Sequence, residues 1–422
     1  MEYFEIDGGK KLFGSVRLSG AKNAVLPLLA SSLLTDEKVV FHDCPRIADV
    51  DIMIDLIRSL GVKCYRDDRT IIKEGSVSEP VISKYYAAKM RASIFLLAPL
   101  LSRCKRVETF YPGGCDIGNR KINLHIENLK KMGASFVEKG CTISGKAQKL
   151  YGKNLALSFP SVGATETLIM ASVLADGVTI IENVAREPEI DDLVDFLNSL
   201  GAKIFKLNES TLKIEGVKSL KGGVWTPVPD RIVGGTLMAF LASCGGELEI
   251  SNFPEKLSHG FTSLLACDTC EITERYNVVK MEGLGQPVSF GNLKTSPYPG
   301  FATDMQAQIL AVSCIADGRT AVEESIFENR FLIAPELAKM GADIVVDGRE
   351  AIVNGVESLC GADVFAKDLR GGAGLCIAAC QAAGKSRVYG VDFIDRGYEN
   401  LDETLSLLGV RIKSCLLYTS DA

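Results

Sequence analysis

The sequence lacks the features of membrane and secreted proteins. It contains no uninterrupted apolar run of the ~18–20 residues that a membrane-spanning helix requires. Its first residues, Met1–Asp7, include neither the basic segment nor the apolar segment of a secretory signal peptide. We therefore expect a cytoplasmic protein that binds no membrane.

Excess basic charge and histidine are also lacking. The 422 residues include 47 Lys and Arg against 53 Asp and Glu, which gives a formal net charge of −6. A general nucleic-acid surface is normally basic, so we expect no nucleic-acid partner and only a local cluster of cations for any anion site. Three histidines and a lone Cys267-x-x-Cys270 pair are too few for zinc spacing, so we expect no bound metal.

Length, hydrophobic residues and cysteine are abundant. A chain of 422 residues with 47% hydrophobic and 24% charged residues suits a globular protein of two domains. Thirteen cysteines without a secretion signal indicate reduced thiols. Six cysteines in or beside apolar runs are expected to be small core residues: Cys44, Cys104, Cys244, Cys314, Cys376 and Cys380.

A short motif of Leu or Met, then Gly, then Ala or Val recurs along the chain. Its copies are centred on Gly61, Gly133, Gly201, Gly341 and Gly409, at intervals of 72, 68, 140 and 68 residues. The double interval predicts a sixth copy near 267–271, where the glycine is absent. Self-similarity at a fixed period indicates a repeat architecture, here six units of about 70 residues.

Each repeat contains two helical patterns and several short β-branched runs. The first helix is apolar on all sides, and its copies begin near residues 21–24, 89–91, 161–163, 230–231, 303–304 and 369–370. The second helix ends at the motif, where the glycine suits a left-handed cap. Its copies are predicted to begin at Asp49, Arg120, Glu189, Arg330 and Arg396.

A unit of this size cannot bury an apolar helix alone, because such a helix must be surrounded by other elements. Three units around a pseudo-threefold axis would enclose their helices behind three sheets, so six units make two domains. The Gly- and Pro-rich stretch 222–229 is the predicted linker. The expected class is α/β (α+β).

Rotational repeats would point equivalent helix starts in the same direction. Helix N-termini carry partial positive charge and unpaired N–H groups, so several together favour an anion. Asp49, Asp230 and Asp304 at such starts are explained by capping. The cations at these starts are not, since they oppose the helix dipole, and they indicate an anion site: Lys22, Arg91, Arg120, Arg330, Arg370 and Arg396.

Two further segments carry candidate chemistry. The stretch 111–120 contains a proline and three glycines, so it is a surface loop that exposes Cys115. Arg120 and Lys121 follow it and would favour the thiolate. Ser161, Val162 and Gly163 open a helix with small residues, which suits contact with phosphate.

These residues together resemble a known family over essentially the whole chain, the UDP-N-acetylglucosamine 1-carboxyvinyltransferases within the enolpyruvyl transferases. The matching segments are Ser19–Ala24, Pro112–Cys115, Ser161–Thr165, Arg186–Ile190, Thr303–Gln308, Phe327–Phe331 and Asp395–Glu399. The resemblance implies a two-domain inverted α/β barrel, with residues 22–229 carrying the Cys115 lid loop, and residues 1–21 and 230–422 forming the other domain.

The resemblance also implies a reaction. The enolpyruvyl group of phosphoenolpyruvate is transferred to the 3-hydroxyl of UDP-N-acetylglucosamine, and phosphate is released, by addition and elimination in an interdomain cleft without a cofactor. This is the first committed step of peptidoglycan precursor synthesis. Family members are targets of fosfomycin, which alkylates the lid cysteine. We expect a monomer.

Roles for particular residues follow from the same resemblance. Lys22, Arg120 and Arg396 would contact the phosphate of phosphoenolpyruvate, and Arg330 and Arg370 its carboxylate, with Arg91 and Cys115 in the same group. Cys115 would act as the acid and Asp304 would deprotonate the sugar hydroxyl. Asp49 and Asp368 would support the site. The UDP-sugar would contact Asn23, Arg91, Lys121, Ile122, Asn123, Leu124, Ser161, Val162, Gly163, Asp304 and Ile326.

Two alternatives remain open at this stage. The first is the shikimate-pathway enolpyruvyl transferase, which shares the fold but lacks the Pro-Gly-Gly-Cys and Ser-Val-Gly-Ala-Thr segments. The second is a catalytically silent paralogue that binds the sugar nucleotide and regulates a partner. The presence of Lys22, Cys115, Asp304, Arg330 and Arg396 argues against the second alternative.

Overall fold

The computed structural model describes residues 2–113, 118, 122–266 and 270–416. The chain folds into two compact units. Unit 1 contains the residues up to Ser19 and those from Pro229 onward, and unit 2 contains Gly20 to Val228, residues 115–119 apart. The structure divides the chain between residues 19 and 20 and between residues 228 and 229. The domain boundaries implied by the resemblance, between 21 and 22 and between 229 and 230, stay a prediction.

The elements of unit 2 follow one another in repeating order. They are α1 (Lys22–Ser31), η1 (Ser32–Leu34), β3 (Val39–Phe41), α2 (Ala48–Ser59), β4 (Lys63–Asp67), β5 (Thr70–Glu74), α3 (Lys84–Lys89), η2 (Arg91–Leu96), α4 (Leu97–Cys104), β6 (Arg106–Phe110), α5 (Asn123–Lys131), β7 (Ser135–Lys139), β8 (Thr142–Lys146), β9 (Asn154–Ala156), α6 (Val162–Val173), β10 (Val178–Glu182), α7 (Pro188–Ser199), β11 (Lys203–Asn208), β12 (Thr211–Glu215) and β13 (Gly223–Trp225).

Unit 1 repeats this order, with two strands supplied by the start of the chain. Its elements are β1 (Glu2–Asp7), β2 (Leu12–Arg17), α8 (Arg231–Cys244), β14 (Gly246–Ser251), α9 (Glu255–Leu265), β15 (Cys270–Arg275), β16 (Val278–Gly283), β17 (Asn292–Lys294), η3 (Thr303–Met305), α10 (Gln306–Ser313), β18 (Arg319–Glu323), α11 (Ala334–Lys339), β19 (Asp343–Asp347), β20 (Glu350–Asn354), β21 (Asp363–Phe365), α12 (Leu369–Gln381), β22 (Lys385–Tyr389), α13 (Val391–Ile394), α14 (Leu401–Leu407) and β23 (Arg411–Leu416).

One sheet design recurs through the described part of the chain. Five sheets have four strands, in orders such as β9-β10-β12-β11 and β17-β18-β20-β19, and the sixth has three, β6-β8-β7. In each four-stranded sheet one outer strand is parallel to its neighbour, as β9 is to β10, and the other pairs are antiparallel. The repeats predicted from the glycine spacing are therefore repeats of structure.

The start of the chain completes sheets of unit 1. Strand β1 lies between β22 and β23, with Phe4 opposite Val388 and Ser414. Strand β2 runs parallel to β14, which follows α8. Strand β13, the last strand of unit 2, runs parallel to β3 of the same unit. The chain passes between the units after Ser19 and after Val228, and a strand close to each of these points completes a sheet whose other strands lie far away in the sequence.

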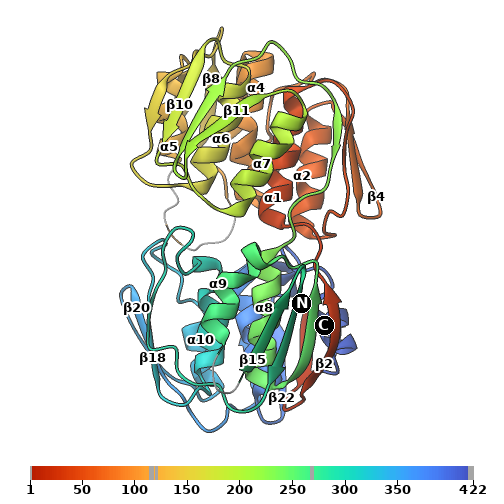
Figure 1. The fold of residues 1–422 in the computed structure, drawn as a ribbon, viewed down its shortest axis with the longest axis vertical. Coiled ribbons are helices and arrows are strands. Elements are labelled where there is room, and N and C mark those ends of the chain that lie inside the picture. Colours follow the sequence, from red (N-terminus) through yellow and green to blue (C-terminus); the bar gives the residue numbers. More distant parts are fainter. Residues whose placement is uncertain (1, 114–117, 119–121, 267–269, 417–422) are drawn as a thin grey trace, which may run out of the picture. The chain divides into compact units, whose positions relative to one another are not determined.

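Apolar helices form the centre of each unit. In unit 1, α8, α10 and α12 pack against one another and are almost wholly buried. Small residues allow this contact, since a Cβ on Gly374 of α12 would lie 2.8 Å from the Ala307 carbonyl oxygen of α10. Figure 1 shows α8 and α10 side by side, between β18 and β20 on one side and β15 on the other. In unit 2, Ala164–Val173 of α6 is buried throughout.

The motif glycines occupy the predicted left-handed caps. Their φ angles are 85° at Gly61, 105° at Gly133, 101° at Gly201, 92° at Gly341 and 96° at Gly409, each within two residues after a helix ends. The predicted sixth copy also appears as a helix followed by a strand, since α9 ends at Leu265 and β15 begins at Cys270.

Two predicted helix starts are wrong. Helix α11 begins at Ala334 and α14 at Leu401, so Arg330 and Arg396 lie in turns that precede these helices. Pro335 in the first turn of α11 favours a start there, and Asn400 at φ 43° interrupts any earlier start of α14. Lys22, Arg91 and Arg370 do lie at helix starts, whereas Arg120 lies outside the described residues.

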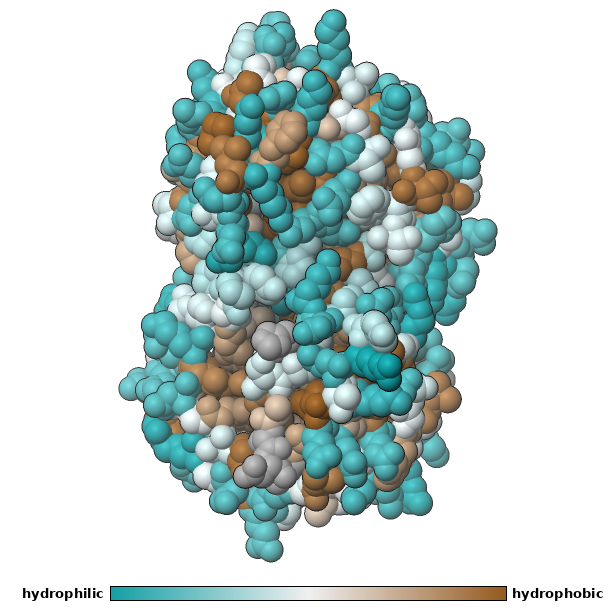
Figure 2. All heavy atoms as spheres, in the orientation of Figure 1, coloured by the Kyte–Doolittle hydropathy of each residue, from teal (hydrophilic) through white to brown (hydrophobic). Residues whose placement is uncertain are grey.

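The face shown in Figure 2 is mainly hydrophilic, with apolar side chains scattered over it. Large exposed apolar residues are spread over many elements, among them Phe13, Phe205, Tyr276, Val345 and Leu407. Singly exposed apolar residues are ordinary in globular proteins. Among the described residues, no helix has both the length and the apolar composition to cross a membrane.

Replacement of a cap glycine tests the backbone requirement. At Gly341, φ is 92° and an added Cβ would meet nothing within 4 Å, so Gly341→Ala introduces backbone strain without a clash. We expect a loss of about 1–2 kcal/mol in unfolding free energy, measured by urea denaturation with circular dichroism. Gly260→Ala, inside α9 and equally open, is the matched control and should be neutral or stabilising. Equal effects of both changes would contradict the cap assignment.

Candidate active site

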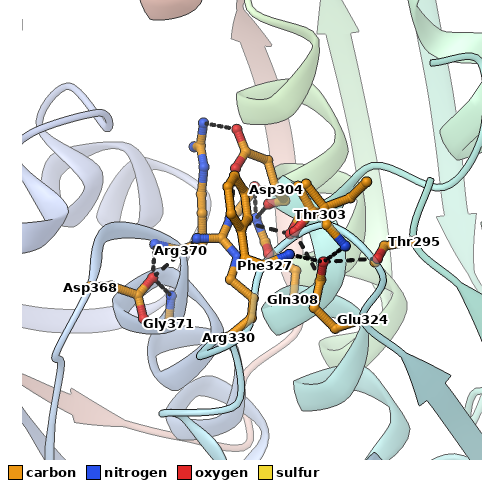
Figure 3. Close-up of polar contacts among 12 residues, drawn as sticks. Thr295, Thr303, Asp304, Gln308, Glu324, Phe327, Arg330, Asp368, Arg370 and Gly371 are labelled. Carbon is orange, nitrogen blue, oxygen red and sulfur yellow. Dashed lines mark hydrogen bonds and ion pairs between the residues drawn. The ribbon is translucent and has the colours of Figure 1, made fainter. Parts of the chain in front are cut away.

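Two buried arginines converge on one carboxylate in unit 1 (Figure 3). Arg330 Nη2 lies 2.6 Å from Asp304 Oδ1, and Arg370 Nη2 lies 3.3 Å from Asp304 Oδ2. The two arginine side chains are 4% exposed, whereas that of Asp304 is 30% exposed. Asp304 is therefore the solvent-exposed member of the cluster, and it pairs with both buried cations.

Further contacts hold the two guanidinium groups. Arg330 donates to the Thr303 carbonyl oxygen at 3.3 Å, and its guanidinium lies 5.6 Å from the centre of the Phe327 ring. Arg370 donates to Tyr398 Oη at 3.1 Å. Burial alone would lower the pKa of Arg370, but Tyr398 and Asp304 raise it above its ordinary value, so the side chain stays charged.

Two carboxylates position the backbone around this cluster. Asp368 caps α12, where its Oδ1 accepts from the N–H groups of Arg370 and Gly371 at 3.0 Å each. Glu324 is 1% exposed and accepts from Thr295 and Thr303 at 2.9 and 2.8 Å. It also accepts from the N–H groups of Ile326 and Phe327 at 2.8 and 3.0 Å. The backbone of Ile326 is thus fixed by the same carboxylate that holds Thr303, the neighbour of Asp304.

Arg396 has a different setting from the two clamped arginines. It is half-buried in the turn between α13 and α14. Gly397, the next residue, lies directly against the start of α12, because an added Cβ there would be 2.7 Å from Leu369 Cδ2. The turn that carries Arg396 is therefore packed onto the helix that carries Arg370.

Unit 2 contains a second buried ion pair. Lys22, the first residue of α1, places Nζ 2.7 Å from Asp49 Oδ2 at the start of α2. The side chains are 11% and 4% exposed. A buried lysine needs such a partner, since desolvation otherwise favours its neutral form. Asn23 follows Lys22 and is half-buried.

The start of α6 forms a candidate phosphate site in unit 2. Ser161 caps the helix, its Oγ accepting from the Ala164 N–H at 3.4 Å, and Val162 and Gly163 are half-buried beside it. Gly163 lies against the His125 ring, since an added Cβ would be 3.3 Å from His125 Cε1. Burial, and then the charge of Arg91, lower the pKa of His125 to about 3.

Not every predicted ligand residue presents its side chain. Ile122 is 7% exposed and belongs to the core of unit 2, so only its backbone could serve a ligand. Asn123 is exposed at the start of α5, and Leu124 packs partly against the core. Three predicted site residues lie outside the described residues: Cys115, Arg120 and Lys121.

The predicted core cysteines are mostly buried. Cys44, Cys314, Cys376 and Cys380 are buried, whereas Cys104 and Cys244 are half-buried at helix ends. Burial raises the pKa of Cys44 and of Cys314 to about 12, which makes both thiols poor nucleophiles.

Several residues of these clusters were not among the predicted site residues. Gln308 donates to the Asp304 carbonyl oxygen at 2.9 Å, and its spacing four residues beyond Asp304 could have placed it on the same helical face. Tyr398 and His125 lie close to motifs that we singled out. Glu324 sits at the end of an apolar run, and no sequence pattern indicates that it organises a loop.

This arrangement can bind a small anion. Arg330 and Arg370 offer charge-assisted donors in a dry setting, and Asp304 is the open carboxylate between them. No group of three or more His, Cys, Asp or Glu side chains in the described ranges is arranged to hold a metal. The gathering of these cations with those of unit 2 in one cleft stays a prediction.

Comparison with known proteins agrees with the fold and the motifs. The sequence model of the EPSP synthase (3-phosphoshikimate 1-carboxyvinyltransferase) family matches residues 6–405. The chain therefore belongs to this family of enolpyruvyl transferases. Within it, the chain is 43% identical to UDP-N-acetylglucosamine 1-carboxyvinyltransferase 2 of Caldanaerobacter subterraneus subsp. tengcongensis, over 98% of this chain and 99% of that protein. It is 42% identical, with the same coverage, to UDP-N-acetylglucosamine 1-carboxyvinyltransferase of Actinobacillus succinogenes.

Solved structures share the fold at low identity. The enolpyruvyl transferase NikO from Streptomyces tendae superposes with a TM-score of 0.88 at 24% identity, over 98% of this chain and 99% of that one. An EPSP synthase structure from Acinetobacter baumannii gives 0.76 at 15% identity, over 99% and 100%. The predicted α/β class and the predicted family resemblance are confirmed.

The setting of His125 predicts acid sensitivity of unit 2. The pKa of His125 falls from 6.5 to about 3 on folding. Below pH 6.5 the imidazole is therefore protonated in the unfolded chain but stays neutral in the folded chain. The contribution to stability is present above pH 6.5 and is lost as the pH falls. We expect unit 2 to lose about 2 kcal/mol more between pH 7 and 5 in the wild type than in His125→Asn.

Trp225, the only tryptophan, lies in unit 2, so its fluorescence during urea unfolding at both pH values reports the relevant transition. His42→Asn changes an exposed histidine that contacts Thr70 at 3.2 Å and serves as the control. An identical pH dependence of His125→Asn and the wild type would contradict the burial of a neutral imidazole.

Proposed function

We propose that the chain transfers the enolpyruvyl group of phosphoenolpyruvate to the 3-hydroxyl of UDP-N-acetylglucosamine and releases phosphate. The observation that carries this proposal is the 42–43% identity, over nearly the full length, to proteins named for this activity. The reaction would supply peptidoglycan precursors in the cytoplasm, and the chain would act as a monomer.

The chemistry is an addition followed by an elimination. The sugar hydroxyl loses its proton and its oxygen bonds to C2 of phosphoenolpyruvate, while C3 gains a proton. The C2–O bond to phosphate then breaks and C3 loses a proton, which restores the double bond. Only protons and phosphate move, so the chain needs acids, bases and cations rather than a redox cofactor.

The cluster in unit 1 suits the donor and the base of this reaction. Arg330 and Arg370 would bind the carboxylate of phosphoenolpyruvate, and Arg396 its phosphate. Asp304, the open carboxylate of the cluster, would accept the proton of the sugar hydroxyl. In this structure the two carboxylate oxygens of Asp304 already accept from both arginines, at 2.6 Å from Arg330 Nη2 and 3.3 Å from Arg370 Nη2. The donor carboxylate and Asp304 would therefore compete for the same donors.

The residues of unit 2 suit the sugar nucleotide and the leaving phosphate. The start of α6, with Ser161, Val162 and Gly163, offers backbone N–H groups and a helix dipole to a diphosphate. Lys22, held by Asp49 at 2.7 Å, would contact the phosphate of phosphoenolpyruvate. Asn23, Arg91 and residues 121–124, together with Ile326 of unit 1, would complete the UDP-sugar site. Cys115 and Arg120 would supply the acid and a further cation.

Phosphate release from phosphoenolpyruvate tests the proposal. We expect release that requires UDP-N-acetylglucosamine and does not occur with shikimate 3-phosphate, measured by a colorimetric phosphate assay. Release with shikimate 3-phosphate alone would assign the chain to the other branch of the family. Absence of release with either acceptor would favour a silent binding protein.

Asp304→Asn separates catalysis from binding of the donor. Loss of the base should lower the rate of phosphate release by ~10²-fold or more. Because the neutral amide no longer competes for Arg330 and Arg370, phosphoenolpyruvate should bind the resting protein about tenfold more tightly, measured by calorimetry without the sugar nucleotide. Asp343→Asn, an exposed carboxylate of the same unit that contacts Asn354 at 3.0 Å, should change neither quantity. Weaker binding to Asp304→Asn would contradict the competition.

A further inference from the structure

A buried network connects both sides of the ion pair between Asp304 and Arg370. Tyr398 Oη lies 3.1 Å from Arg370 Nη1 and 3.0 Å from Thr236 Oγ1. Gln308 Nε2 lies 3.0 Å from Thr236 Oγ1, 3.3 Å from Tyr398 Oη and 2.9 Å from the Asp304 carbonyl oxygen. The side chains come from α8, α10 and the turn before α14, and Tyr398, Gln308 and Thr236 are at most 2% exposed.

The supply of protons fixes the direction of these hydrogen bonds. Thr236 has one hydroxyl proton, which it donates to the Ile232 carbonyl oxygen at 2.7 Å. Its oxygen must therefore accept from Tyr398, so the Tyr398 hydroxyl donates to Thr236 and accepts from Arg370, which has donors only. The chain of donation runs one way, from Arg370 through Tyr398 and Thr236 to the backbone of α8.

The orientation of Gln308 is fixed by the same reasoning. The Asp304 carbonyl oxygen can only accept, so the amino group of Gln308 must face it. A flipped amide would place a carbonyl oxygen against the Asp304 carbonyl oxygen and would leave Thr236 and Tyr398 without this donor. Gln308 therefore ties the backbone of Asp304 to the network that holds Arg370.

Tyr398 also lies two residues beyond Arg396. Its ring is buried, and the Arg370 guanidinium lies 5.4 Å from the ring centre. Burial raises the pKa of Tyr398, while Arg370 and Thr236 oppose this only in part, so the hydroxyl keeps its proton. One side chain thus joins the guanidinium of Arg370 to the turn that carries Arg396, and the close contact of Gly397 with Leu369 supports the same attachment.

We propose that Tyr398 is a positioning residue of the site: its hydroxyl sets the plane of the Arg370 guanidinium and anchors the Arg396 turn, with Thr236 and Gln308 completing the support. Arginine has a long rotatable side chain, and an anchor on Nη1 determines where Nη2 points. Tyr398 itself contacts no reacting atom. The inference rests on the proposed function, because it assigns Arg370 and Arg396 to phosphoenolpyruvate.

Tyr398→Phe tests the hydroxyl and keeps the ring. We expect the KM for phosphoenolpyruvate to rise ~10- to 100-fold, since a hydrogen bond to a charged group is lost, and the KM for UDP-N-acetylglucosamine to stay unchanged. The thermal midpoint should stay close to that of Tyr389→Phe, a buried tyrosine stacked on Phe365 at 4.7 Å in the same unit. A merely structural role would instead lower the midpoint and raise both KM values.

Substitutions of Thr236 provide a second, independent test of the proposal. Thr236→Ser keeps the hydroxyl and should behave as the wild type, whereas Thr236→Val removes the acceptor of Tyr398 and should raise the same KM. Because both residues act in one chain of donation, the double variant Tyr398→Phe/Thr236→Val should be no worse than Tyr398→Phe alone. Additive effects, or a wild-type KM for phosphoenolpyruvate in Tyr398→Phe, would overturn the inference.

Failure of the proposed function gives a different result. A wild-type protein that releases no phosphate with UDP-N-acetylglucosamine contradicts the activity. In that case crystal structures of the wild type and Tyr398→Phe still decide the positioning role. An Arg370 guanidinium that keeps the same plane in Tyr398→Phe would refute it, and a displaced or disordered guanidinium would support it.

Discussion

The structure depends on one constraint, that helices apolar on all sides must be enclosed. A single repeat exposes such a helix, and the helices α8, α10 and α12 solve this by packing against one another behind sheets. Enclosure buries the sides of these helices and leaves their ends next to the connecting turns. The ion-paired cluster lies at these ends, where Asp304, Asp368 and Arg370 begin or precede their helices.

The charged side chains buried at these helix ends form groups in which cations and carboxylates neutralise one another. Arg330 and Arg370 are buried against Asp304, with Asp368 Oδ1 4.0 Å from Arg330 Nη1. Two cations and two carboxylates give no net charge, which reduces the cost of desolvation. In unit 2 the buried charge of Lys22 is neutralised in the same way by its ion pair with Asp49.

The sequence predicted the parts of the fold that depend on periodicity. The spacing of the motif glycines predicted six units and their left-handed caps, because glycine at positive φ is a local requirement. The starts of α11 and α14 were not predicted, since Pro335 and Asn400 act one turn later than the spacing of the arginines suggested. The resemblance implied only that residues 1–21 join the second domain. The pairing of β2 with β14 and of β13 with β3 is seen only in the structure, as strand pairing over such distances leaves no local pattern.

The candidate site was predicted where charge stood out against its surroundings. Arg330, Arg370, Asp304 and Asp368 were named from unusual charge at helix starts or from the resemblance, and the structure brings these four together. The hydrogen-bonding roles of neutral polar residues such as Gln308 and Thr236 could not be predicted, because a buried amide or hydroxyl in an apolar helix looks like any other tolerated substitution. Their partners become visible only when α8 and α10 are packed.

The place of β1 between β22 and β23 has a consequence for biosynthesis. Strands β1 and β2 are translated before unit 2, whereas the strands that they pair with, β14, β22 and β23, are translated after it. Unit 2, which is built almost wholly from residues 20–228, can fold before β14, β22 and β23 are available to pair with Glu2–Arg17. Strand β2 then stays unpaired until β14 is made, and β1 until β22 and β23 are made, so both strands are open to mispairing and aggregation in the meantime.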